Sequence, residues 1–222
     1  MRGMFFVMAV VVAMLAGCKS SQKSNTGKSG MNKTEKGAVI GASTGAVVGG
    51  IIGNKSKNTA LGAILGAAVG GSVGAVIGNK MDRQAKKMQE DLGGAVTVER
   101  VGEGIKLTFN SQLLFDFGEA TIMKTNDGDL QQFAETLKQY PDTYVLIVGH
   151  TDNVGSDAFN QKLSKKRSAA VSNRLASLGV SASRLKTQGK GETQPLVSND
   201  TEANRAQNRR VEIAIYANEK MK

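Results

Sequence analysis

A glycine-rich internal repeat restricts the fold of this chain more than any other feature. The segment GAVIGASTGAVVGGIIGNK at 37–55 returns as GAILGAAVGGSVGAVIGNK at 62–80. In both copies a glycine stands at every fourth position, which places the glycines on one slowly turning face of a helix. Glycine costs about 1 kcal/mol per residue in a helix relative to alanine. So many glycines therefore indicate that close helix packing or contact with lipid offsets the loss.

The two copies are predicted to form a glycine-zipper helical hairpin over 37–80, joined by the polar link 54–59. An uncharged stretch of about 17 residues is about 25 Å long as a helix, at the short edge of a membrane span. The spacing does not decide between a hairpin that crosses a bilayer and one that self-associates. A flexible Gly/Ala linker is the other interpretation, and the strict spacing argues against it.

The N-terminal residues 1–17 are predicted to be a signal peptide, with Arg2 ahead of an apolar run at 5–14. The run ends in LAGC, and this pattern resembles a bacterial lipobox. The resemblance implies cleavage before Cys18 and lipid on its sulfur, with two or more acyl chains giving stable anchoring. An ordinary signal peptide before a chance cysteine is the alternative, but Cys18 is the only cysteine in the chain. Lys19, which follows it, implies delivery to the outer membrane, as in enterobacterial lipoproteins.

Two further segments connect the predicted parts. Residues 18–36 are rich in Ser, Asn, Lys and Gly and are predicted to be a flexible tether, and 81–94 is predicted to be a charged helical connector. The formal net charge is +10. For an exported, lipid-anchored protein this charge favours an anionic envelope surface over nucleic acid, and the absence of Trp argues against a platform for stacking bases.

Residues 95–222 have the composition of a globular domain in which strands and helices alternate. The expected fold class is α+β, a two-layer α/β sandwich with a mixed sheet and helices on one face. Strands are expected at 96–101, 105–109, 144–148, 185–188 and 211–216, and helices at 125–139, 158–178 and 202–207.

The residues that could carry catalysis are few. His150 is the only histidine, so a zinc site with several converging ligands is not expected, and no cofactor is predicted. His150 and Asp152 stand two apart at a strand end, a poor arrangement for a nucleophilic triad. His150 is interpreted as a strand-end residue that hydrogen-bonds nearby backbone, and the chain is not expected to be an enzyme. A wall-modifying hydrolase that uses both residues is the alternative, and it would release soluble muropeptides.

The helix predicted at 157–178 places polar residues in its apolar arc. On a helical wheel Arg167 and Asn160 fall beside Leu163, and a cation placed there requires a partner. Thr151 and Asp152 lead from the central strand into this helix, whose N-terminus favours an anion. Asp152 and Arg167 in one pocket would suit a zwitterion, with the ammonium at the aspartate and the carboxylate at the arginine. Arg174 is interpreted as part of a structural ion pair.

Several spaced motifs carry a family resemblance. They are GHTDNVGSDAFNQKLSKKRSAAV at 149–171, LLFDFGEATI at 113–122, YPDTYVLIVGHTD at 140–152 and NRAQNRRVEIAI at 204–215. Together they resemble the OmpA-like C-terminal domain, which Pal and MotB proteins share, and the repeat resembles the glycine zipper that precedes this domain in some envelope lipoproteins. The resemblance implies non-covalent binding of peptidoglycan through diaminopimelate, gripped by Asp152 and Arg167. It also implies these neighbouring pocket residues: Asn160, Thr151, Leu163, Arg209 and, more weakly, Thr121.

We therefore expect a lipoprotein of the outer membrane that tethers it to the cell wall, with its globular domain in the periplasm. Its expected partners are peptidoglycan, membrane lipid through Cys18, and other copies of the chain through the glycine zipper. The alternative is an oligomeric, membrane-inserting assembly or envelope-stability factor that acts through the hairpin. Deletion of 37–78 would then abolish the phenotype, whereas Asp152→Ala would not.

Overall fold

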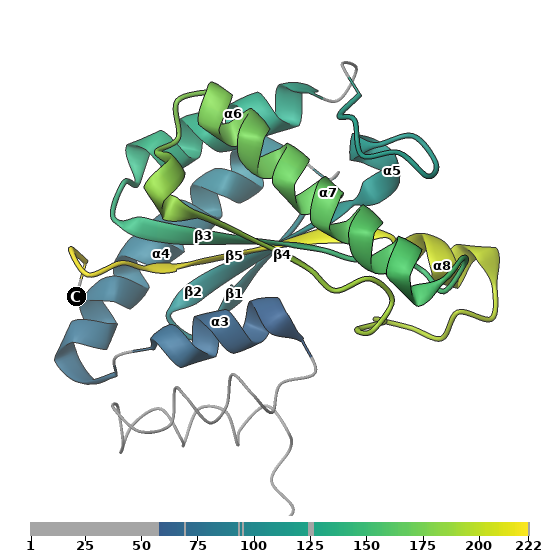
Figure 1. Cartoon of the computed structure of the whole chain (residues 1–222). Helices are drawn as coiled ribbons and strands as arrows, with labels where there is room; N and C mark the ends of the chain where they lie inside the picture. The colour runs from purple at the N-terminus through teal and green to yellow at the C-terminus, as the bar shows by residue number, and fades with distance from the viewer. Residues whose placement is uncertain (1–57, 69, 93, 95, 124–126, 222) are drawn as a thin grey trace, which may run out of the picture.

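The computed structural model describes residues 58–221 except 69, 93, 95 and 124–126. The predicted signal peptide, Cys18, the tether and the first copy of the repeat therefore lie outside the described residues. A five-stranded mixed sheet forms the centre of the domain, in the order β1-β2-β5-β3-β4 (Figure 1). The strands are β1 (Val96–Val101), β2 (Gly104–Asn110), β3 (Thr143–Gly149), β4 (Leu185–Gly189) and β5 (Arg210–Ala217). The helices are α3 (Thr59–Ala67), α4 (Gly71–Leu92), α5 (Ser111–Leu114), α6 (Asp127–Gln139), α7 (Asp157–Ser177) and α8 (Glu202–Asn208), with a 3₁₀ turn at Ala182–Arg184.

The order of the strands follows from their connections. β1 and β2 form an antiparallel hairpin, and Gly102 supplies the positive φ of 53° that its turn requires. β5 is antiparallel to both β2 and β3, so the last strand of the chain lies in the middle of the sheet. β3 and β4 are parallel, and α7 is the crossover between them. The central β3 and β5 are apolar over most of their length because both faces are covered.

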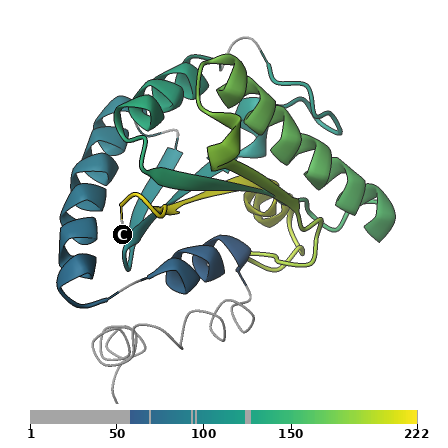
Figure 2. The same ribbon diagram turned by 60° about the vertical axis from the view of Figure 1, so that its left-hand side comes forward.

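One face of the sheet carries the main apolar core. α4, α6 and α7 cover this face, and Figure 2 shows α4 running beside the β1 edge towards α6. Fully buried apolar side chains each contribute about 1.5–3 kcal/mol relative to exposure. The core includes Ile77, Met81, Met88, Ile105, Leu107, Phe109, Leu130, Phe133, Leu137, Val145, Ile147, Val171, Leu175, Ile213 and Ile215.

α7 begins and ends where its sequence signals stand. The Ser156 side chain caps it by accepting a hydrogen bond from the amide of Phe159 at 3.2 Å. Gly179, with φ 93°, follows its last turn. Arg174 contacts Asp127 of α6 through two of its nitrogens, which confirms the predicted ion pair and joins α6 to α7.

The second copy of the repeat differs from its prediction, because it is not a single helix over 62–80. α3 ends at Ala67, Gly70 and Gly71 adopt positive φ of 69° and 67°, and α4 runs without a break through the predicted connector to Leu92. The turn between β1 and β2 explains the break. The Glu103 carboxylate accepts a hydrogen bond from the amide of Gly70 at 2.8 Å, and so caps the start of α4. A Cβ on Gly74 would lie 2.2 Å from the same carboxylate, so this glycine lets the β-turn approach the helix.

α3 occupies the face of the sheet opposite α6 and α7 (Figure 1). The sandwich was expected to have helices on one face, and this short helix adds a third layer. Ile64 packs there with Leu146, Val148 and Ala214. Gly104 of β2 allows α3 to pack closely against the sheet, since a Cβ at this position would lie 2.6 Å from Cγ2 of Ile64. The repeat thus contributes to the globular domain as well as preceding it.

The expected α+β architecture is confirmed, and each strand and helix predicted within 95–222 is present with its ends shifted by no more than a few residues. α5 and the 3₁₀ turn were not predicted. Across the described residues, no helix combines the length and apolar character that a bilayer crossing requires.

Candidate functional site

The predicted clamp lies where β3 ends and α7 begins. After β3 the backbone remains fixed, because the amide of His150 donates to the carbonyl of Arg210 and the amide of Thr151 donates to that of Gly191, both at 2.9 Å. Gly149 permits α7 to pass very close, since a Cβ there would lie 2.2 Å from the Ser164 carbonyl oxygen. The chain therefore leads directly from a buried strand into a polar cluster held against α7.

Asp152 is paired within this cluster. Its Oδ2 accepts a hydrogen bond from Nη1 of Arg209 at 2.6 Å, and its Oδ1 accepts one from the amide of Val154 at 3.1 Å. Nη2 of Arg209 donates to the exposed Glu202 at 2.6 Å. Burial alone would lower the pKa of Arg209, but its hydrogen bonds with the two carboxylates outweigh burial, and the pKa is raised. Asp152 and Arg209 thus form a buried ion pair with an outer carboxylate.

Arg167 enters the same cluster from α7 with only 3% of its surface exposed. Its Nε donates to the carbonyl of Glu119 at 2.8 Å, and its guanidinium lies 5.3 Å from the centroid of the Phe115 ring. Within the described part of the chain, no hydrogen bond uses its two terminal nitrogens. Burial lowers the pKa of Arg167, the charge of Arg209 adds to this effect, and Asp152 opposes it. The side chain nevertheless stays charged. Arg167 is therefore a buried cation whose terminal N–H groups are available to hydrogen-bond a ligand.

Asn160 and Thr151 line the same region. Nδ2 of Asn160 donates to the Val154 carbonyl at 3.1 Å and to Glu192 at 2.6 Å, which fixes the loop before α7. The Thr151 hydroxyl is buried and makes no hydrogen bond with the described residues. Glu192 and Glu202 were missed by the sequence analysis, because both are distant in sequence from Asp152, Glu192 in the loop after β4 and Glu202 at the start of α8.

Leu163 and Thr121, the two remaining predicted residues, lie in a neighbouring groove. The loop 118–121 and one face of α7 enclose this open groove, which has a volume of about 520 Å³. Leu163 is almost buried, whereas Thr121 is exposed. The structure therefore brings Asp152, Arg167, Arg209, Asn160 and Thr151 into one buried cluster, with Leu163 and Thr121 beside it.

His150 lies outside this arrangement. It is fully buried, and neither ring nitrogen makes a hydrogen bond within the described structure. The backbone hydrogen bond expected of this strand-end residue is made by its amide and not by its ring. Nε2 lies 3.9 Å from Glu212, beyond hydrogen-bonding distance. Burial, with the charges of Arg210 and Lys190, lowers the pKa of His150 to about 2. A neutral, inaccessible imidazole does not fit the hydrolase alternative, which needs His150 to reach a substrate.

Glu212 and Arg210 form a second buried polar pair that the sequence analysis missed. Nε of Arg210 donates to Glu212 at 2.8 Å, and Nδ2 of Asn58 donates to both oxygens of Glu212 at 3.0 and 2.8 Å. Asn58 also caps α3 by accepting from the amide of Leu61 at 2.9 Å. This network attaches α3 to the sheet. Among the described residues, no cluster of His, Cys, Asp and Glu is arranged to hold a metal ion.

Comparison of the sequence with known protein families identifies the class of protein to which this fold and this cluster belong. The OmpA family model matches residues 114–209, and the YMGG-like Gly-zipper model matches residues 1–82. The chain belongs to the OmpA family.

One relative extends the match to nearly the whole chain, and others match its C-terminal part. The chain is 37% identical over 212 residues to the probable lipoprotein YiaD of Escherichia coli K12, which covers 95% of this chain and 96% of YiaD. It is 43% identical over 96 residues to the peptidoglycan-binding protein ArfA of Mycobacterium tuberculosis, which is 43% of this chain and 29% of ArfA. Among solved structures, the cell wall anchor of the T6SS from Pseudomonas aeruginosa superposes with a TM-score of 0.56 at 29% identity, covering 62% of this chain and 99% of the anchor.

Proposed function

We propose that this chain binds peptidoglycan non-covalently through the diaminopimelate residue of the stem peptide. The observation that carries the proposal is the buried cluster in which Arg167 keeps two terminal nitrogens without hydrogen-bond partners among the described residues, beside the Asp152–Arg209 pair. A buried cation with unused donors is costly unless an anion completes its coordination.

The side-chain end of diaminopimelate carries one carboxylate and one ammonium, and the cluster offers a partner for each. The planar guanidinium of Arg167 suits a bidentate carboxylate. Asp152 would accept the ammonium through lone pairs that Arg209 and Val154 leave unused. Only 4% of Asp152 and 3% of Arg167 are exposed, so both charges are largely shielded from solvent. The chemistry is recognition and requires no bond to be broken.

The relatives support the same assignment. ArfA is named as peptidoglycan-binding, and the type VI anchor is named for attachment to the cell wall. YiaD, which matches nearly the whole chain, is named as a probable lipoprotein. We therefore propose that acyl chains on Cys18 hold the N-terminal end in the outer membrane while the globular domain grips the wall in the periplasm. Incorporation of labelled palmitate into the wild type, and its loss in Cys18→Ser, would test the anchor.

The alternative role for the glycine repeat is not favoured by the described contacts. Gly70 and Gly74 approach Glu103 at the turn between β1 and β2, and the Gly78 carbonyl accepts from Arg100 of β1 at 3.4 Å. Within the described residues, these three glycines of the second copy contact the β-hairpin formed by β1 and β2. Self-association through the repeat stays a prediction.

Co-sedimentation with insoluble sacculi tests the proposed function. The full chain in detergent should bind, and folded Asp152→Asn and Arg167→Lys should each lose at least about tenfold in affinity, since truncating one partner of a buried charge pair costs 2 kcal/mol or more. Asp157→Asn is the matched control, because Asp157 is an exposed acid in the first turn of the same helix. Sacculi with lysine in place of diaminopimelate lack the carboxylate and should bind weakly. Folded variants that bind as well as wild type would refute the clamp.

A further inference from the structure

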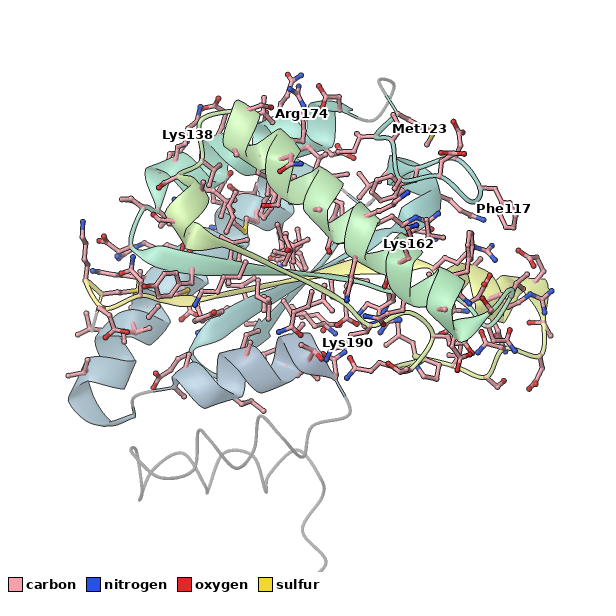
Figure 3. All side chains as sticks on the ribbon, in the orientation of Figure 1. Phe117, Met123, Lys138, Lys162, Arg174 and Lys190 are labelled. Carbon is pink, nitrogen blue, oxygen red and sulfur yellow. The ribbon has the colours of Figure 1, made fainter. Side chains whose placement is uncertain are left out.

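The groove beside the clamp has a definite chemical character. On one side stands the loop 118–121, and on the other stands a face of α7 that presents Phe159, Lys162, Leu163 and Lys166 at helical spacing. Leu163, with 9% exposure, gives the groove an apolar floor, and Phe159 is 53% exposed. Figure 3 shows Lys162 on α7 and Phe117, 80% exposed, on the loop next to the groove.

The groove is continuous with the clamp. Glu119 lines the groove, and its carbonyl accepts the hydrogen bond from Nε of Arg167 at 2.8 Å. Lys166, which also lines the groove, directly precedes Arg167 in the chain, and Leu163 precedes it by one helical turn. A peptide whose zwitterionic side chain ended at Arg167 and Asp152 would therefore have its adjoining residues in this groove.

The charges of the groove favour an anion. Lys162 and Lys166 are one turn apart on α7 and exposed, and within the described residues neither takes part in an ion pair or side-chain hydrogen bond. Like charges at this spacing repel each other, and a carboxylate placed between them would relieve the repulsion. Glu119 is the single acid that lines the groove in the described structure, so the cations are in excess.

We propose that this groove is a second subsite, which binds the carboxylate of the acidic residue next to diaminopimelate and so distinguishes a free carboxylate from an amidated one. This inference rests on the proposed function, because the clamp sets the position of the peptide. Lys162 and Lys166 provide the charge, and Leu163 and Phe159 offer apolar surface to the methylene groups of the γ-linked acidic residue. Because both lysines are exposed, each ion pair is weak and sensitive to salt.

Two synthetic tripeptides test the subsite, L-Ala-γ-D-Glu-diaminopimelate with a free glutamate α-carboxylate and the same peptide with that group amidated. Calorimetry on the full chain at low ionic strength should show the free acid binding about three- to tenfold more tightly. Lys162→Gln/Lys166→Gln should bind both peptides equally, at the affinity that the wild type has for the amidated one. Lys165→Gln is the matched control on the same helix, since Lys165 packs beside Gly189 and does not line the groove.

The outcomes separate the subsite from the clamp. If the wild type binds both peptides equally, or if the double variant keeps the preference, the subsite is refuted while peptidoglycan binding stands. If the wild type binds neither peptide, the proposed function and the subsite fail together. A preference that remains undiminished in 0.5 M salt would also contradict a contact between exposed charges.

Discussion

Nη1 of Arg209 donates to Oδ2 of Asp152 at 2.6 Å, and the two side chains, 57 residues apart in the sequence, retain only 7% and 6% exposure. The pair joins the end of β3 to the start of β5. With the amide of Val154, which donates to Oδ1, it also fixes the orientation of the Asp152 carboxylate. Binding and stability therefore depend on the same aspartate.

Arg209→Ala should lower the free energy of unfolding by about 3 kcal/mol, because it leaves the Asp152 carboxylate buried without its cation. Arg205→Ala is the control, since Arg205 pairs with the same outer Glu202 from a half-exposed position and should cost less than about 1 kcal/mol. Denaturant unfolding measures both. Asp152→Asn combined with Arg209→Ala should recover part of the loss. If the two arginine variants lose the same free energy of unfolding, the buried pair contributes no more to stability than the exposed one.

His150 should make the protein less stable as the pH falls below neutrality. Its pKa is about 2 in the folded chain and about 6.5 in an unfolded one, so below pH 6.5 the unfolded chain binds the extra proton. The free energy of unfolding should then fall by up to about 1.4 kcal/mol per pH unit. The groups that face the ring are Arg210, Lys190 and Glu212. The lowered pKa values of Asp91 and Asp127 add further losses only below about pH 4.

Unfolding measured between pH 6 and 4.5 isolates this effect, because His150 is the only histidine in the sequence. In His150→Leu the free energy of unfolding should be nearly constant across this window. A slope that persists in His150→Leu would assign the effect to other groups.

Asn58→Ala should release α3 from the sheet. The change removes the helix cap, worth about 1 kcal/mol, and two hydrogen bonds to the buried Glu212 carboxylate, worth another 1–3 kcal/mol. Hydrogen exchange should show lower amide protection in α3 together with the loss of stability. Asn110→Ala removes a comparable cap, which accepts from the amide of Gln112 at 2.9 Å, and should cost about 1 kcal/mol. Equal effects of the two changes would mean that Glu212 contributes nothing to holding α3.

The sheet and α7 could be predicted because their signals are local. The apolar runs of β3 and β5 indicate strands covered on both faces, and Ser156 and Gly179 mark the ends of α7. Arg167 could be singled out because a helical wheel places it among apolar residues. Each of these inferences needs only residues within one turn or one strand.

The partners of these residues could not be predicted, because they come from distant parts of the chain. Glycine at every fourth position allows a helix to approach either another helix or a β-turn, and the contact that the second copy makes is with Glu103, 33 residues after Gly70. Similarly, nothing in the sequence near Asp152 shows that Arg209 is its cation. His150 was expected to hydrogen-bond nearby backbone, and its amide does so, but its buried ring nitrogens make no hydrogen bond with the described residues.

Gly149→Ala should disturb binding and stability together, because the new Cβ would lie 2.2 Å from the Ser164 carbonyl oxygen and 3.0 Å from its carbon. These are backbone atoms in the middle of α7, so the helix must shift as a unit, at a cost of about 1–3 kcal/mol. Arg167 lies one turn further along α7 and would move with it. Gly128→Ala in α6 is the control, since beyond its chain neighbours and the backbone of its own helix no described atom lies within 4 Å of the added Cβ. It should raise stability by up to about 1 kcal/mol and leave sacculus binding unchanged. If Gly149→Ala matches wild type in both measurements, the close contact between β3 and α7 does not position the clamp.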